Sequence, residues 1–351
     1  MRGSPLARDS SGAPSPYSTD SSEEDIQDFS SLEIIAAPRP SIRTSAGNLS
    51  PIDLRMIHHW SIVTAQCTAV GKGANTALQT AVPQLAFEND FLLNTIMGIA
   101  TLHVQQTVGG IPEFQKRIDV YRVKAMAGYR EALAKIQPET TTFESALISS
   151  ILLVILWSRS RLMEEGELIV TNWFLLYQGI SFLAKSRKVP SVEGLSVSPV
   201  FKRQWSELLV TPAIPRVLLE MLQEITPMDS DYPYLEYYCT MLDALGNLYG
   251  SLKQDGLTDN LYVRIISWPS LAPVGFNNRA RAQNPRALVI LAHYLTFVKL
   301  AKHIWWTVGI PDTDIDTIAE LLGPLWLPFL AVPIEARMMS KSEDIATLLL
   351  R

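Results

Sequence analysis

Apolar residues dominate long stretches of the chain from residue 50 onward, and glycine and proline separate these stretches. The chain is organised around one of them, residues 285–309, PRALVILAHYLTFVKLAKHIWWTVG. Pro285 fits a first helical turn, and Gly309 followed by Pro311 predicts the end. The pattern predicts a helix of about 24 residues, roughly 36 Å long, that is solvated along one edge and covered elsewhere. The stripe of polar residues on that edge comprises Arg286, His293, Thr296, Lys299, Lys302 and His303.

The region before residue 190 predicts five helices joined by short connections. Ser50, Pro51 and Asp53 form a strong helix start, because serine caps the helix, proline fits its first turn and the acid reaches back to the cap. Thr141 and Glu144 have the same capping-box spacing. The predicted helices cover residues 50–70, 91–108, 112–137, 141–157 and 168–188.

Shorter helices are predicted after residue 200, at about 201–210, 213–225 and 231–254, and a proline-rich, extended connector at 264–278. Thr313 and Ser340 are expected to cap two last helices, since an acid follows each three residues later. No segment alternates between apolar and polar residues as a half-buried strand would. The sequence therefore predicts an all-α fold, a multi-helix bundle or array around a long buried C-terminal helix.

Residues 1–49 differ from the rest because they are rich in serine and proline and carry an acidic patch, SSEEDIQDF. Few large apolar residues are available there to offset the entropy of ordering, so we expect a disordered tail or linker. Residues 23–29 have two interpretations, a phosphorylatable or activator-like segment and a plain solvated linker. Residues 50–351 are then expected to form a single all-α domain.

Composition excludes several classes of protein. A net charge of −5 and a pI near 5.6 give no support for a nucleic-acid-binding surface. Two cysteines, Cys67 and Cys239, cannot make a disulfide framework or a structural zinc site, and they are typical of a reduced, intracellular protein. The charge-free run at 145–158 is too short to cross a bilayer, and no secretory signal is present, so we expect no membrane span.

Catalytic and metal-binding patterns are also missing from the sequence. The adjacent His58 and His59 would point about 100° apart on a helix, and a HExxH-type spacing is absent. Asp312, Asp314 and Asp316 lie at a predicted helix start, where acids favour the positive end of the helix dipole. We therefore predict no catalytic residue, no cofactor and no metal ligand.

Aromatic residues are the remaining signal for a site. They gather on the 285–309 stretch and on the segment that follows it. Such a set could line a lipid-sized, mostly apolar cavity, and its alternative is ordinary core packing. The candidate ligand-pocket residues are Tyr294, Phe297, Trp305, Trp306, Trp326 and Phe329.

Six short motifs in order carry a resemblance to a known family. They are LRMIHHW (residues 54–60), VPQLAF (82–87), FLLNTIMGIATLH (91–103), ISWP (266–269), PRALVILAHY with Trp305 and Trp306, and the Leu325–Trp326 helix. Over residues 50–335 the chain resembles the C-terminal regulatory domain of fungal zinc-cluster transcription factors, with the sterol uptake control proteins as the nearest subgroup. The resemblance implies a helical domain that senses an apolar ligand and regulates transcription.

The resemblance also implies an N-terminal six-cysteine zinc cluster, and residues 1–49 contain no cysteine. We therefore expect a chain that lacks the zinc-cluster module, does not bind nucleic acid directly and acts through other transcription proteins in the nucleus, the cytoplasm or both. Its expected partner is an apolar small molecule such as a sterol or a secondary-metabolite intermediate, and homodimer formation stays open. Two alternatives remain, a stand-alone cyclase or isomerase of secondary metabolism that uses the same cavity, and an interaction scaffold with a filled core.

Overall fold

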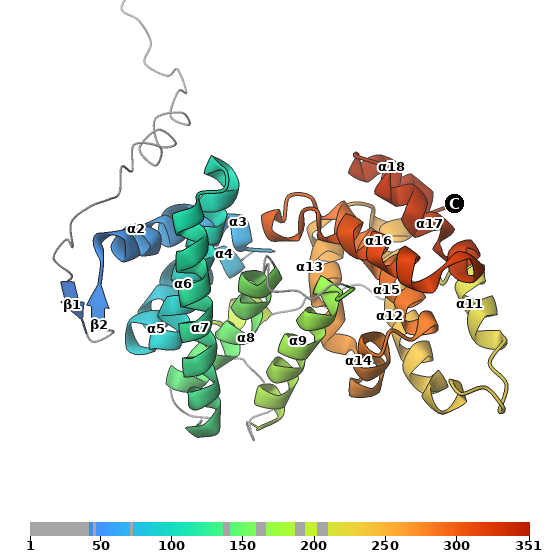
Figure 1. Cartoon of the computed structure of the whole chain (residues 1–351), viewed down its shortest axis with the longest axis horizontal. Coiled ribbons are helices and arrows are strands. Elements are labelled where there is room, and N and C mark those ends of the chain that lie inside the picture. The colour runs from blue at the N-terminus through green and yellow to red at the C-terminus, as the bar shows by residue number, and fades with distance from the viewer. Residues whose placement is uncertain are drawn as a thin grey trace, which may run out of the picture. The chain divides into compact units, whose positions relative to one another are not determined.

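The computed structural model describes residues 42–44, 47–70, 73–135, 141–158, 166–186, 194–201 and 210–351, and these residues are mainly helical (Figure 1). The predicted all-α class is confirmed. One short antiparallel ribbon was not predicted, in which β1 (Ile42–Thr44) pairs with β2 (Gly47–Leu49). This ribbon falls within the predicted tail, and the rest of that tail lies outside the described residues.

The first helix begins where the capping residues predicted it. Ser50 Oγ accepts the backbone N–H of Asp53 at 3.3 Å, and Asp53 Oδ2 accepts the backbone N–H of Ser50 at 2.7 Å. The helix then runs through α2 (Pro51–His59), a π-helical turn (Trp60–Thr64) and α3 (Ala65–Thr68). The buried indole of Trp60 donates to the carbonyl of Leu78 at 3.0 Å, which ties this helix to the next segment.

Helices α2 to α10 form the N-terminal region, residues 51–201 (Figure 1). The helix α6 (Asp90–Val108) packs on α7 (Pro112–Lys135) and α8 (Thr141–Ser158). Gly109, at φ 89°, ends α6 as the sequence predicted, because a left-handed residue there costs glycine little. The region also contains α4 (Ala74–Thr76), a π-helical turn (Ala77–Ala81), α5 (Val82–Glu88), α9 (Ile169–Ser186) and α10 (Ser198–Phe201).

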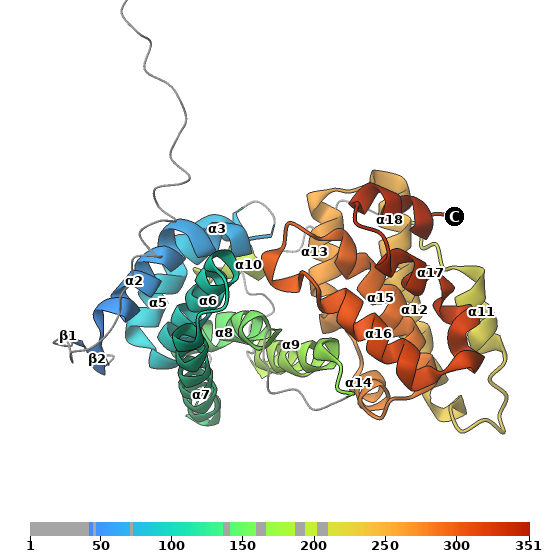
Figure 2. The same ribbon diagram turned by 45° about the horizontal axis from the view of Figure 1, so that its top comes forward.

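The C-terminal region is built around α15 (Pro285–Leu300), whose residues from Ala287 to Leu300 are all buried. Figure 2 shows α12 and α16 beside it, and α17 also packs on it. The other elements are α11 (Arg216–Gln223), α12 (Leu235–Asp255), α13 (Asp259–Ser267), α14 (Val274–Arg281), α16 (Ile310–Leu322), α17 (Leu327–Arg337) and α18 (Ser342–Leu349), with short 3-10 turns at Tyr232–Tyr234, Trp268–Leu271, Trp305–Thr307 and Pro324–Trp326.

The central helix is shorter than the sequence predicted, since it ends at Leu300 rather than near Gly309. At Ala301 the backbone leaves the helix with ψ 48°. Hydroxyl groups replace the lost helical hydrogen bonds, because Ser342 Oγ donates to the carbonyl of Leu300 at 3.1 Å and Thr307 Oγ1 donates to that of Ile304 at 2.9 Å. Tertiary contacts therefore override the helical pattern.

The predicted solvated edge of this helix is also wrong within α15. His293, Thr296 and Lys299 are at most 8% exposed, and each makes a hydrogen bond. Lys302 and His303 are exposed, but they follow the end of the helix. His293 and Lys299 thus bond to neighbouring segments and Thr296 to the carbonyl of Ala292 in its own helix, an arrangement that a sequence pattern cannot distinguish from a solvated face.

Two further predictions are corrected. Residues 264–278 are not an extended connector, because they fold as the end of α13, a 3-10 turn and most of α14. Thr313 does not cap α16, which begins at Ile310 after Gly309, and Thr313 Oγ1 instead donates to the carbonyl of Gly309 at 3.1 Å. The helix predicted at 201–210 lies almost entirely outside the described residues.

Among the described residues, no single helix combines the length and apolarity needed to cross a membrane. One pair of helical segments, 305–322 and 324–337, reaches that length and composition only when taken together, with a bend of 113° between them.

Candidate ligand-binding site

The six aromatic residues proposed from the sequence lie in separate places. Tyr294 and Phe297, on α15, are fully buried. The ring of Tyr294 stacks on Trp268 with centroids 4.1 Å apart, and its hydroxyl donates to the carbonyl of Ile265 at 3.0 Å. Phe297 packs edge-on against Tyr249, with centroids 4.8 Å apart. Both residues therefore pack in the core, and their assignment as ligand contacts stays a prediction.

Trp305 and Trp306 follow the end of α15 and contact different helices. The indole of Trp305 lies 4.7 Å from the ring of His103 on α6, and its Nε1 donates to Thr68 Oγ1 at 3.3 Å. Trp306 packs edge-on against Trp173 of α9, with centroids 5.4 Å apart. The two adjacent indoles therefore contact different helices, Trp305 α6 and Trp306 α9.

Trp326 and Phe329 form a third, half-buried group at the start of α17, with ring centroids 5.6 Å apart. The guanidinium of Arg286 lies 5.9 Å from the ring of Trp326. The carbonyl of Phe329 accepts from His293 Nε2 at 2.9 Å. These two residues contact Arg286 and His293 of α15. Their role as ligand contacts also stays a prediction.

A cavity of about 840 Å³ lies where the N-terminal region meets α13 and Trp306, and we name it the apolar cavity. Its volume falls in the range of small-molecule sites. Most of its walls are aliphatic or aromatic, as a site for an oily ligand requires. Representative wall residues are Leu78, Ile151 and Ile155 from the N-terminal region, Phe201 of α10, Val263 of α13, and Trp306.

Polar groups of the apolar cavity are concentrated on α13. Its first turn contributes Thr258, Asp259 and Asn260, and Thr258 Oγ1 accepts the N–H of Leu261 at 3.4 Å as the helix cap. At the far end of α13, the hydroxyl of Tyr177 donates to the carbonyl of Ile266 at 2.8 Å. The cavity thus combines apolar walls with polar groups near the two ends of α13.

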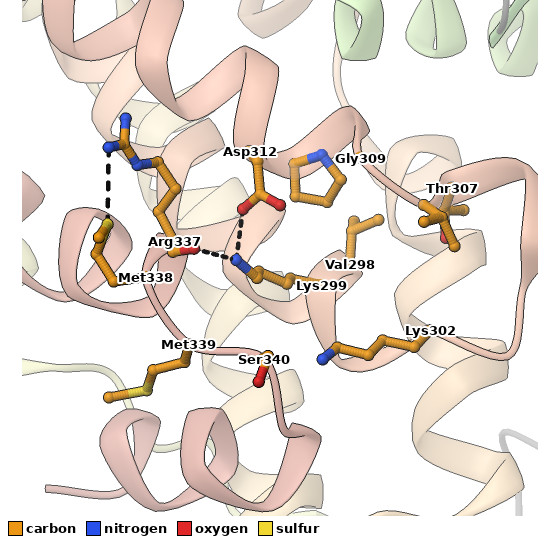
Figure 3. A pocket seen from close by; sticks show the side chains of 12 residues that line it. Val298, Lys299, Lys302, Thr307, Gly309, Asp312, Arg337, Met338, Met339 and Ser340 are labelled. Atoms are coloured by element: carbon orange, nitrogen blue, oxygen red, sulfur yellow. Dashed lines mark hydrogen bonds and ion pairs between the residues drawn. The ribbon is translucent and has the colours of Figure 1, made fainter.

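A second, smaller pocket of about 430 Å³ lies between the end of α15, the start of α16 and the end of α17. Figure 3 shows the Nζ of Lys299 reaching Asp312 and the backbone of Arg337. Lys299 donates to Asp312 Oδ1 and to the Arg337 carbonyl, each at 2.5 Å. The buried ammonium of Lys299 is already bonded within the protein and is not available to a ligand. We therefore favour the larger cavity as the site.

Of the two adjacent histidines considered as metal ligands, His58 is exposed and His59 is half-buried, with its ring centroid 5.7 Å from that of the buried His103 on α6. Burial lowers the pKa of His59 to about 4, with further lowering by the charges of His103 and His58. Burial also lowers the pKa of His103, whose Nδ1 lies 3.2 Å from Thr64 Oγ1. Within the described part of the chain no three His, Cys, Asp or Glu side chains gather as a metal site would need.

Sequence reasoning missed most of the apolar cavity. Of the six proposed aromatics, only Trp306 is among the residues that line it. Its walls, such as Ile155 and Val263, read in the sequence as ordinary core residues. The one local signal was Thr258 with Asp259, a helix-cap pair, and such pairs are too common to mark a ligand site.

Comparison with known proteins gives one family match, in the N-terminal part of the chain. Residues 55–205 match the family described as "Fungal specific transcription factor domain". The chain is 22% identical over 343 residues to a "Zn(2)-C6 fungal-type transcription factor" of Gibberella zeae, a match that covers 87% of this chain and 66% of that protein. It is 27% identical over 301 residues to "Sterol uptake control protein 2" of Saccharomyces cerevisiae, covering 80% of this chain and 31% of that protein.

A shorter match, 28% identical over 140 residues, links the chain to "Sterol uptake control protein 2" of Candida albicans, with 40% of this chain and 19% of that protein covered. The matches therefore span no more than two thirds of the length of these relatives. The resemblance predicted from the six motifs is confirmed. Residues 55–205 match the model of the fungal specific transcription factor domain, and the chain is similar over a longer stretch to a Zn(2)-C6 fungal transcription factor and to a sterol uptake control protein.

Proposed function

We propose that residues 50–351 are one regulatory domain of a transcription regulator, and that this domain binds an apolar small molecule in the apolar cavity. The observation that carries the proposal is the cavity itself, whose walls come from both the matched segment, through Ile151 and Ile155, and the C-terminal region, through Val263 and Trp306. A ligand there would contact both regions and could shift the population between two packings of the domain.

A sterol is the first ligand to test, since two relatives carry the name "Sterol uptake control protein 2". An intermediate of secondary metabolism is the second. Action in the nucleus through other transcription proteins is part of the same proposal and is supported by the relatives' printed names. The cyclase or isomerase alternative has no observation in its favour, because the cavity presents one carboxylate, Asp259, among its described lining residues, and no acid–base pair.

Thermal unfolding with and without ligand tests this proposal. Ergosterol or cholesterol should raise the unfolding free energy, because a ligand that binds only the native state stabilises it by about 2.7 kcal/mol at 100 times its Kd. Ile151→Trp, which fills the cavity, should abolish the shift. Val120→Trp places the same side chain on the outside of α7, where Val120 is 51% exposed, and should leave the shift intact.

Two results would contradict the proposal. One is that neither sterols nor polyketide-like compounds change the melting temperature of the wild-type protein. The other is that Ile151→Trp, shown to be folded by circular dichroism, responds to the ligand as strongly as Val120→Trp does.

A further inference from the structure

The first turn of α13 gives the apolar cavity a polar end of a defined kind. Asp259 is exposed and Asn260 half-buried, and both line the cavity. Within the described structure neither side chain makes a hydrogen bond, so their polar atoms are free to meet a ligand. Thr258 uses its oxygen as an acceptor for Leu261 N–H, which leaves its own O–H to donate.

The charge of this end is negative. Among the described lining residues of the apolar cavity, Asp259 carries the one formal charge, and no Lys, Arg or His accompanies it. A carboxylate head would meet a like charge while leaving water, and like charges at close range disfavour both ionised forms. A hydroxyl head could donate to Asp259 and accept from Asn260 or Thr258, so that it replaces the water it loses by at least two hydrogen bonds.

The length of α13 fits an elongated ligand. Thr258 and Ser267 stand nine positions apart, about 13 Å along a helix. Between them Val263 and Ile266 line the cavity, as do Ile151 and Ile155 of α8. An amphiphile lying along α13 would therefore place its head at the first turn and its apolar body between these aliphatic side chains.

Building on the proposed function, we infer that the apolar cavity selects a neutral, hydroxyl-headed amphiphile over a carboxylate-headed one, with Asp259 as the residue that sets this preference. Asp259 accepts the ligand hydroxyl and repels an anionic head. Asn260 and Thr258 complete the hydrogen bonds of that hydroxyl. The aliphatic walls accept the body of the ligand without regard to its head.

The experiment compares probe pairs that share a body and differ in the head: cholesterol against cholesteryl hemisuccinate, and hexadecanol against hexadecanoate, at pH 7.5. Binding is followed by tryptophan fluorescence, for which Trp306 in the cavity wall is the expected reporter, and by thermal unfolding. The wild-type protein should bind each alcohol about tenfold more tightly than the matched acid, the order expected for one partly screened charge.

Two variants separate charge from shape. Asp259→Asn keeps the size of the side chain and should reduce the preference to about twofold, while Asp259→Lys should reverse it. Asp243→Lys makes the same charge change at an exposed position of α12 away from the cavity and should leave the wild-type ratio unchanged. Circular dichroism checks that each variant is folded. Asp259→Asn keeps the test valid even if the lysine variant disrupts the first turn of α13.

The outcomes distinguish this inference from the proposed function. If the wild-type protein binds acid and alcohol equally, or if Asp259→Asn keeps the tenfold preference, the assignment to Asp259 is wrong while the ligand site stands. If no probe of either kind binds, the proposed function fails, and the inference fails with it.

Discussion

Two buried helices, α6 in the N-terminal region and α15 in the C-terminal region, are held in different ways. In α6 the buried hydroxyls of Thr95 and Thr101 donate to carbonyls of the same helix, each at 2.7 Å. His103, whose Nδ1 lies 3.2 Å from Thr64 Oγ1, is the exception, and the other buried side chains that α6 presents to its neighbours are mainly apolar. Gly98 allows the closest approach, since a methyl group there would lie 2.8 Å from Leu156 Cδ1.

In α15 two buried polar side chains, His293 and Lys299, reach other segments, while Thr296 donates to the carbonyl of Ala292 in its own helix. His293 Nε2 donates to the carbonyl of Phe329, and its Nδ1 accepts from the hydroxyl of Tyr249 at 3.0 Å, so the ring is neutral. Burial accordingly lowers the pKa of His293 to about 4. Lys299 is paired with Asp312 and the Arg337 backbone. Shape positions α6, whereas α15 is additionally fixed in register by directional bonds, and mutations should separate these two cases.

The largest effect is expected at Asp231, next to the start of α15. Its side chain is 3% exposed and pairs with Arg279 and Arg286, and it also accepts from the amide of Asn284. Burial by itself would raise the pKa of Asp231, but the hydrogen bonds from Asn284 and Arg286 and the charge of Arg279 lower it. Asp231→Ala should destabilise the protein by about 3 kcal/mol, because it removes the carboxylate that two partly buried guanidinium groups share, although Arg286 keeps its bond to Asp229 at 3.0 Å.

Urea unfolding measures this loss, and an exposed pair supplies the control. Glu131 and Lys135 on α7 are bonded at 2.7 Å with side chains more than half exposed. Glu131→Ala should change the free energy of unfolding far less than Asp231→Ala does, because solvent screens an exposed pair. Equal effects of the two substitutions would show that the buried network does not position α15.

The second effect tests packing in the N-terminal region. Gly98→Val adds carbon atoms where Leu156 and Tyr121 already meet α6, so we expect a destabilisation of about 1–3 kcal/mol. Gly110 has no atom within 4 Å of an added Cβ, and Gly110→Ala should be close to neutral. A Gly98→Val protein as stable as the wild type in urea would mean that α6 and α8 are packed more loosely than this contact indicates.

The third effect concerns the joint between the two regions. Asp314 of α16 is buried and accepts the N–H groups of Ile169 and Val170, at 3.1 and 2.9 Å, at the start of α9. Burial raises its pKa to about 7 despite these two donors. Between pH 4 and 7 the native carboxyl therefore holds a proton that the unfolded chain has lost, so its contribution to stability falls as the pH rises.

Asp314→Asn removes this titration. The unfolding free energy of the wild type minus that of Asp314→Asn should therefore decrease from pH 5 to pH 7, by at most about 1.4 kcal/mol per pH unit. The buried histidines act in the opposite direction, because their lowered pKa values cost stability as the pH falls below 6.5, but they cancel in this difference. A difference that stays constant across the range would contradict the raised pKa of Asp314.

The comparison also shows what the sequence could predict. Gly109 and Pro112 mark the boundaries of α6 and α7 because their backbone preferences act locally. The end of α15 could not be predicted, since it depends on Ser342 and Thr307 replacing helical bonds. The same holds for the apolar cavity, because Ile155 and Val263 become neighbours only through the tertiary fold and have no chemical feature that distinguishes them from core residues.

The smallest effect is local to the start of α2. Ser50→Ala removes the side chain that accepts Asp53 N–H, and caps of this kind contribute about 1 kcal/mol. Asp53 should keep much of its role, because its carboxylate also accepts from Tyr121 of α7 and lies 3.7 Å from Arg117. The loss should therefore appear as faster hydrogen exchange in the first turn of α2, with α15 unchanged.

Thr80→Ala, which removes an exposed hydroxyl bonded only to its own helix, is the matched control. If Ser50→Ala instead accelerated exchange in α15, the two regions would unfold as one cooperative unit. The different contacts of α6 and α15 would then not give the two helices different local stabilities.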